Sequence, residues 1–124
     1  MIDKTIVREF FLIMNEINPI SDASIASAAM RLRAGGLVAF PTETVYGLGA
    51  DATNPSAVAQ IFATKQRPQF NPLISHVAST EKAFELGVET PIALALANAF
   101  WPGPLTLILH RKTHCPVAML ATAG

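Results

Sequence analysis

Apolar residues recur along the chain first at helical spacing and then in short runs, which predicts helices that alternate with strands. The first helix is expected over Ser24–Ala34, where the apolar side chains between Ile25 and Leu32 share one face. Gly35 and the glycine after it stop this helix, because glycine readily adopts the conformation that ends helices. Leu37–Phe40 follows as a short buried strand. A helix that leads through glycine into a buried strand is half of an α/β unit.

Three more helices are predicted, and each begins with a residue whose side chain suits a helix N-cap. Their N-caps are Asn54, Ser79 and Thr90, and the helices reach about Thr64, Leu86 and Phe100. Two further strands, Leu73–Val77 and Leu105–Leu109, are predicted from their apolar and β-branched residues. This order of helices and strands implies an α/β domain.

The two ends of the chain are less regular. Residues 4–17 fit both a helical stripe and a buried strand. We treat residues 1–16 as an N-terminal extension and residues 17–124 as the domain, because a family resemblance described below covers only the latter. Pro116–Gly124 is apolar and begins another element, whereas a complete α/β domain first closes its sheet. We therefore expect an α/β fold that is truncated at the C-terminus, or one whose open sheet edge needs a partner.

Composition excludes several classes of protein. Of the 124 residues, 51% are hydrophobic and 15% charged, which is typical of a globular chain. Nine basic and nine acidic residues cancel, so there is no basic excess of the kind that broad nucleic-acid surfaces show. The single cysteine, Cys115, allows no internal disulfide and suits a reducing compartment. The longest apolar run, Ile92–Ala97, is far short of a membrane span of about 20 residues. These features predict a cytoplasmic protein without a membrane segment.

The first candidate for chemistry is Pro41–Ala50, which we predict to be a shaped loop after a buried strand, where α/β proteins place ligand loops. Gly47 and Gly49 permit a tight backbone path close to a ligand. Tyr46 offers a flat face with a polar tip. Two hydroxyls come from Thr42 and Thr44. From spacing alone, a turn that carries surface hydroxyls remains an equal alternative.

The second candidate is the proline-stiffened segment that follows the predicted helix ending near Thr64. Lys65 and Arg67 lie two residues apart, so both can reach one anion, the arginine as a bidentate fork. The alternative is that these cations interact favourably with the dipole at the C-terminus of the helix and bind no ligand. Asn71 follows on the same loop, and His76 lies in the strand predicted next. A lone strand histidine is more often structural than a ligand contact.

A metal site is not predicted. His110, His114 and Cys115 lie close in sequence, but spacing of this kind suits a helix, and this stretch follows a predicted strand and ends at Pro116.

Taken together, three segments resemble the YrdC-like family of threonylcarbamoyl-adenylate synthases. The first is Gly35–Asp51, which reads GGLVAFPTETVYGLGAD. The second joins Lys65-Gln-Arg-Pro to Asn71-Pro-Leu-Ile-Ser-His. The third is Phe100–Leu109, which reads FWPGPLTLIL. The resemblance covers about residues 17–124 and implies a YrdC-like twisted, mixed sheet flanked by helices around a concave positive cavity.

The resemblance also implies an activity and the residues that perform it. The threonine amine takes up bicarbonate as a carbamate, which then attacks the α-phosphorus of ATP and releases pyrophosphate. Threonine would meet Thr44 and His76, with Tyr46 lining its pocket. ATP would meet Arg67 and Asn71, with Lys65 on phosphate or carbamate, so Lys65 and Arg67 are the expected catalytic cations. Mg²⁺ would arrive on the ATP phosphates.

The implied partners are L-threonine, bicarbonate and ATP, together with tRNA or double-stranded RNA and tRNA-modification proteins. Family members continue into an Arg-containing strand and a Ser-Ala-Asn loop, which do not follow Gly124 here. Two alternatives therefore stay open. One is a non-catalytic module that binds double-stranded RNA, and the other is an inactive fragment.

Overall fold

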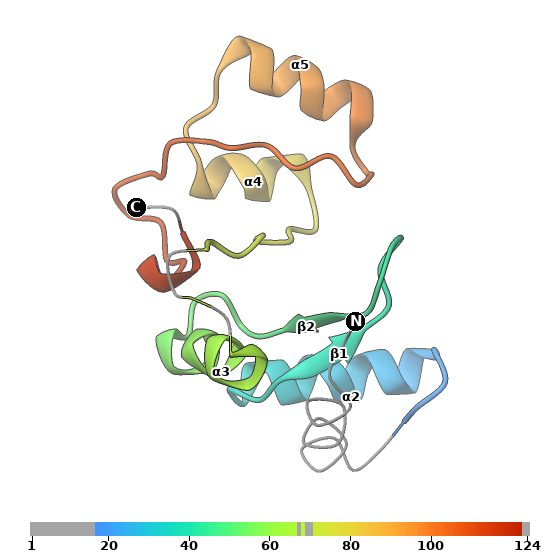
Figure 1. The fold of residues 1–124 in the computed structure, drawn as a ribbon. Coiled ribbons are helices and arrows are strands. Elements are labelled where there is room, and N and C mark those ends of the chain that lie inside the picture. The colour runs from blue at the N-terminus through green and yellow to red at the C-terminus, as the bar shows by residue number, and fades with distance from the viewer. Residues whose placement is uncertain (1–16, 67, 69–70, 123–124) are drawn as a thin grey trace. The chain divides into compact units, whose positions relative to one another are not determined.

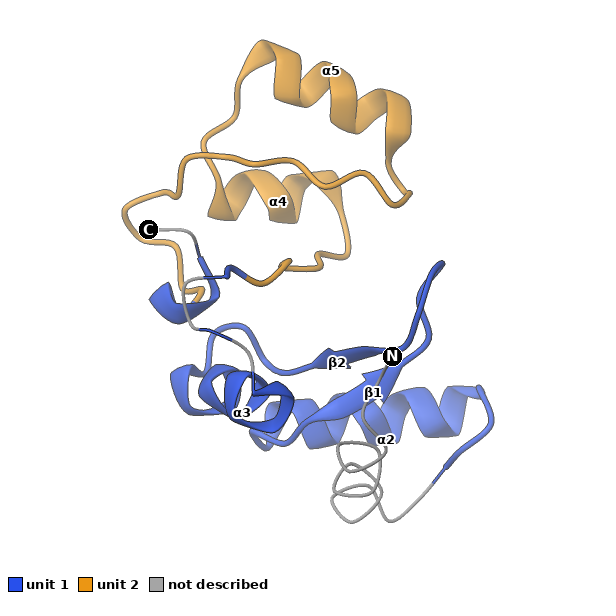
Figure 2. Ribbon diagram, viewed as in Figure 1, with its two compact units in different colours: residues 1–72, 118–124 blue, residues 73–117 orange. Residues whose placement is uncertain are grey.

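The computed structural model describes residues 17–66, 68 and 71–122. The chain divides into two compact units, which Figure 2 shows in different colours. Unit 1 comprises residues 1–72 and 118–124, and unit 2 comprises residues 73–117. The predicted N-terminal extension, residues 1–16, lies outside the described residues, and the ambiguity over residues 4–17 stays open with it.

Unit 1 begins with helix α2, Asp22–Arg33, which is the helix predicted from the apolar stripe. Ser21 caps it, because its side chain accepts a hydrogen bond from the Ser24 amide while the Ser24 hydroxyl accepts one from the Ser21 amide. Gly35, at φ +82°, ends the helix as predicted. Strand β1, Val38–Phe40, follows and lies beside α2 (Figure 1).

Strand β2, Gly47–Gly49, pairs with β1 in an antiparallel ribbon. Val38 lies opposite Gly49, and Phe40 lies opposite Gly47. The prediction that Pro41–Ala50 is a loop throughout is therefore wrong at its C-terminal end, because Gly47–Gly49 form a strand that pairs with β1. Among the described residues the sheet consists of these two strands.

Helix α3, Pro55–Lys65, supplies half of the buried apolar residues described in unit 1. Asn54 caps it, with proline at the first helical position as predicted. One of its faces is buried and consists of Ala57, Val58, Ile61 and Phe62. The short 3-10 helix η1, Met119–Ala121, packs against α3, and the Ala118 amide donates to the Ala52 carbonyl at 2.7 Å. The apolar C-terminal stretch thus forms one helical turn within the described residues.

Unit 2 is built from helix α4, Thr80–Leu86, and helix α5, Pro91–Phe100. Both helices and their caps, Ser79 and Thr90, agree with the prediction. Phe84 of α4 meets two small residues of α5, Ala93 and Ala97, in the core. Around them pack Leu94, Trp101, Leu107 and Leu109.

The two strands predicted in unit 2 do not form. Leu73–Val77 and Leu105–Leu109 have no strand partner among the described residues. The second segment nevertheless alternates strictly between half-buried and exposed positions from Leu105 to Arg111, which is the pattern of a strand. A single bridge, Gly87 to Arg111, ties its end to the chain after α4. No helix among the described residues is long and apolar enough to cross a membrane.

Candidate functional site

The Thr42 hydroxyl organises the loop that joins β1 to β2. Its oxygen accepts from the backbone amides of Thr44 at 3.3 Å and Val45 at 3.2 Å. It also donates its proton to the Val45 carbonyl. The Thr44 hydroxyl oxygen lies 3.4 Å from it. Sequence spacing suggested Thr42 only as one of two hydroxyls, whereas the structure makes it the centre of a turn that presents Thr44.

The base of the same loop is fixed by the ring of Phe40. A Cβ atom placed on Gly49 would lie 2.6 Å from the Phe40 ring, and one placed on Gly47 would lie 3.4 Å from it. The two glycines therefore leave room for the ring across the ribbon. This is a packing reason for both glycines, and close approach of a ligand to their backbone stays a prediction.

Beyond this base, the side chains of the loop face solvent. Tyr46 is 75% exposed and Val45 69% exposed, and Thr44 is exposed as well. The loop therefore presents an aromatic ring and a hydroxyl group to solvent.

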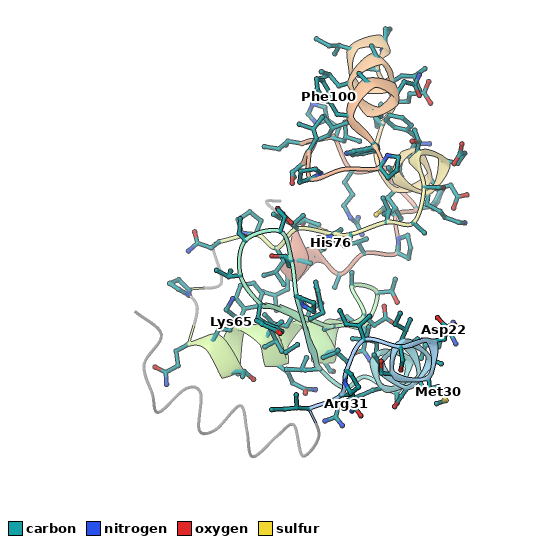
Figure 3. The ribbon with its side chains drawn as sticks, turned by 90° about the vertical axis from the view of Figure 1, so that its right-hand side faces the viewer. Asp22, Met30, Arg31, Lys65, His76 and Phe100 are labelled. Atoms are coloured by element: carbon teal, nitrogen blue, oxygen red, sulfur yellow. The ribbon has the colours of Figure 1, made fainter. Side chains whose placement is uncertain are left out.

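Lys65 is the last residue of α3 and is exposed (Figure 3). Gln66 directly after it adopts the left-handed conformation, with φ 49° and ψ 36°, and its amide donates to the carbonyls of Phe62 and Ala63. A non-glycine residue in this conformation costs about 1 kcal/mol or more. The turn stops the helix at once, so the Lys65 ammonium stands at a helix C-terminus, where the helix dipole favours a cation.

The remaining predicted residues lie in the segment after this turn. Arg67 is outside the described residues. Asn71 is half-buried, and its amide donates to the Pro68 carbonyl at 3.2 Å. His76 is exposed and belongs to unit 2, whereas Thr44 and Lys65 belong to unit 1. Within unit 1 the structure brings Thr44 and Tyr46 onto one loop, and no hydrogen bond joins Thr44, Tyr46, Lys65 or Asn71 to another of these four.

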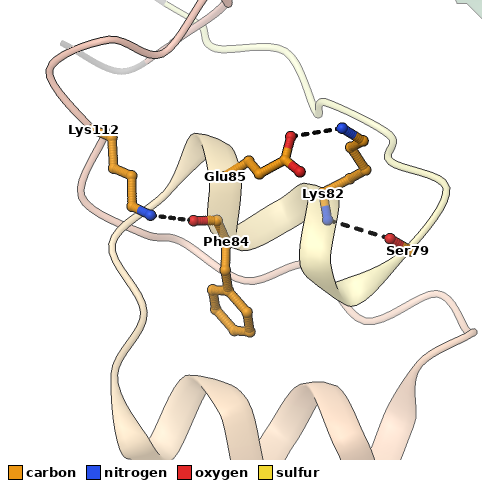
Figure 4. A network of polar contacts seen from close by, with 5 residues as sticks. All are labelled: Ser79, Lys82, Phe84, Glu85 and Lys112. Atoms are coloured by element: carbon orange, nitrogen blue, oxygen red, sulfur yellow. Dashed lines mark hydrogen bonds and ion pairs between the residues drawn. The ribbon is translucent and has the colours of Figure 1, made fainter.

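A separate polar network holds α4 in unit 2 (Figure 4). The Ser79 hydroxyl accepts from the Lys82 amide at 3.3 Å, and the Lys82 ammonium pairs with Glu85 at 2.7 Å. The Lys112 ammonium donates to the carbonyl of Phe84, near the C-terminal end of the helix. These contacts are structural, because each one satisfies a group at a helix end or joins exposed neighbours.

Arg111 likewise has a structural role that sequence patterns did not reveal. Its Nη2 atom donates to the carbonyls of Cys115 at 2.6 Å and Val117 at 2.8 Å. The guanidinium thereby holds residues 115–117 close to Arg111, so that the chain turns back after the extended segment Leu105–Leu109. Its Nε atom is buried and has no hydrogen-bond partner among the described residues. Among all the residues that the structure describes, no three histidine, cysteine, aspartate or glutamate side chains lie close enough together to hold a metal ion.

Comparison with known proteins places these elements in a family. A family model for Sua5, YciO and YrdC proteins, described as telomere recombination, matches residues 30–124. The chain belongs to this family. The match includes all three segments on which the resemblance to YrdC-like proteins rests.

Relatives of this family carry a specific activity in their names. A threonylcarbamoyl-AMP synthase from Pyrococcus abyssi is 51% identical over 106 residues, which are 85% of this chain and 31% of the relative. One from Bacillus subtilis is 52% identical over 93 residues, 74% of this chain and 27% of the relative. The chain thus spans about a third of the length of these relatives.

Solved structures agree with the sequence comparison. Sua5 from Pyrococcus abyssi in complex with L-threonine has a TM-score of 0.77 and 50% identity, covering 86% of this chain and 31% of that one. A double-alanine variant of the same protein gives a TM-score of 0.78 with 50% identity, covering 86% of this chain and 32% of that one. The predicted α/β, YrdC-like fold class is confirmed by this likeness.

Proposed function

We propose that the chain carries the threonine-binding part of a threonylcarbamoyl-AMP synthase. The observation that carries the proposal is the likeness to the L-threonine complex of Sua5, at 50% identity over 86% of this chain. The family match, over residues 30–124, spans the loop organised by Thr42 and the segment from Lys65 to His76. The names of the relatives supply the reaction class.

The proposed reaction joins three small molecules without a covalent enzyme intermediate. The nitrogen of threonine bonds to the carbon of bicarbonate, water leaves, and a carbamate forms. A carbamate oxygen then bonds to the α-phosphorus of ATP, and the bond to pyrophosphate breaks. Steps of this kind depend on positioning and on cations that stabilise charge on the phosphates.

The side chains of the chain divide between these substrates. We assign Thr44, Tyr46 and His76 to threonine, and Asn71 to the nucleotide. Lys65 and Arg67 are assigned to the ATP phosphates and the carbamate. Lys65 is exposed at the end of α3 and forms no ion pair with the described residues, so its charge is available to a phosphate. Mg²⁺ would enter bound to ATP, as a part of the substrate.

The product is an activated carbamoyl group that a further protein would transfer to tRNA adenosine. We propose that the chain works in the cytoplasm with tRNA-modification proteins. Direct contact with RNA through a broad surface is disfavoured, because nine basic and nine acidic residues cancel.

The test is pyrophosphate release from ATP, measured with the 124-residue chain in the presence and absence of L-threonine and bicarbonate. We expect release to require both small molecules. Lys65→Met should lower the rate by at least about tenfold, whereas Lys82→Met, which removes an exposed cation on α4, should leave it unchanged. Release that is independent of threonine, or an equal effect of the two substitutions, would contradict the proposal.

A further inference from the structure

The hydrogen-bonding capacity of the Thr42 hydroxyl is fully used inside its own loop. A threonine hydroxyl has one proton to donate and two lone pairs that accept. The proton goes to the Val45 carbonyl, and the two lone pairs face the amides of Thr44 and Val45. No capacity remains for a ligand, although Thr42 lies in the same threonine-rich loop as Thr44.

From this saturation we infer that Thr42 is a positioning residue, which holds the turn that presents the Thr44 hydroxyl to the amino-acid substrate. The inference rests on the proposed function and adds to it a residue that acts through Thr44. Thr44 is exposed, and its hydroxyl has one contact with the described residues, the Thr42 oxygen at 3.4 Å.

The availability of the Thr44 hydroxyl follows from the same count. Since the proton and both lone pairs of the Thr42 hydroxyl are already engaged, the Thr44 hydroxyl keeps its own proton and its lone pairs for solvent or ligand. Such a hydroxyl can donate to the carboxylate of threonine or accept from its amine N–H or side-chain hydroxyl.

A hydroxyl that is held in place by its own loop loses less conformational entropy when the substrate binds. Removal of the Thr42 hydroxyl therefore weakens threonine binding through the position of Thr44, without a contact between Thr42 and the substrate.

The test uses three single variants and one double variant. Thr42→Val keeps the branched shape and removes the hydroxyl, whereas Thr42→Ser keeps the hydroxyl and serves as the matched control. L-threonine affinity is measured by calorimetry. We expect Thr42→Val to weaken binding about three- to tenfold, which corresponds to loss of one net hydrogen bond, and Thr42→Ser to bind nearly as wild type. ATP affinity should be unchanged in both.

The double variant separates positioning from general stability. If Thr42 acts through Thr44, then adding Thr42→Val to Thr44→Val should weaken threonine binding no further. Additive losses in the double variant would overturn the inference, because they would show that Thr42 acts through another route. Equal affinity of Thr42→Val and the wild type would overturn it as well.

A second readout does not depend on threonine. Amide hydrogen exchange by NMR should show that Thr42→Val exposes the amides of Thr44 and Val45, and that Thr42→Ser protects them. If the folded wild-type chain binds no threonine, the proposed function fails, and selective loss of this protection still supports the positioning role. Unchanged protection in Thr42→Val would overturn that role.

Discussion

Replacement of Gly49 by alanine tests the packing that fixes the candidate loop. The added methyl group would sit 2.6 Å from the nearest carbon of the Phe40 ring. Carbon atoms pack best at about 3.5–4.0 Å, so the overlap is about 1 Å. Gly47→Ala is a close control in the same strand, because its methyl group would lie 3.4 Å from the same ring, which is ordinary contact.

The expected free energies of unfolding differ clearly. Overpacking of this size costs about 1–3 kcal/mol, and the half-buried Phe40 ring can turn partly away, which favours the lower half of this range. Gly47→Ala should be neutral or stabilising by up to about 1 kcal/mol, because alanine lowers the conformational entropy of the unfolded chain. For a chain of 124 residues, each kcal/mol shifts Tm by about 3–6 °C.

Urea unfolding followed by circular dichroism measures both values, provided that the slope m is the same in each variant. A double-mutant cycle with Phe40→Ala then assigns the cause, since the cost of Gly49→Ala should vanish when the ring is absent. Equal stability of the two alanine variants, or a cost of Gly49→Ala that persists without the ring, would refute the reasoning.

Three further predictions concern helix ends. Gln66→Gly should raise the free energy of unfolding by about 0.5–1 kcal/mol, because glycine adopts the left-handed conformation without strain, and urea unfolding would detect this; a loss of stability would contradict it. Lys112→Met should cost about 1 kcal/mol through the lost contact with the Phe84 carbonyl, whereas Lys82→Met should cost at most about 0.5 kcal/mol. The pKa of Glu81 is lowered, mainly by a hydrogen bond from the Glu81 backbone amide and to a smaller extent by one from the Ser79 side chain, which caps α4. Its contribution to α4 is therefore present at neutral pH and is lost as the pH falls through this lowered pKa, which an NMR titration of the Glu81 carboxyl would follow; a pKa at or above the ordinary glutamate value would oppose this account.

Local sequence signals predicted the helices well. The caps Asn54, Ser79 and Thr90 all occupy the predicted positions, because a cap depends on residues within one turn of the helix. Strands depend on a neighbour that the local sequence does not specify. Leu105–Leu109 therefore shows the alternating burial that its residues predict, yet it pairs with no strand among the described residues.

The candidate site was predicted by residue type more than by geometry. The loop with Thr44 and Tyr46 is exposed and ordered by hydrogen bonds, in keeping with a ligand loop. The dominant role of Thr42 was missed, since spacing alone does not distinguish a hydroxyl that binds a ligand from one that shapes a turn. Likewise, the sequence did not predict that the Phe40 ring packs against Gly49, because that contact depends on the register of the two strands.

The most direct test of the central claim is a calorimetric titration of L-threonine into the 124-residue chain, followed by ATP with Mg²⁺ and bicarbonate, beside an Arg67→Ala variant. The account predicts saturable binding of L-threonine by both proteins, and nucleotide binding that Arg67→Ala weakens by at least about tenfold. A chain that is folded by circular dichroism and yet gives no saturable heat with L-threonine would contradict the claim that it carries the threonine site.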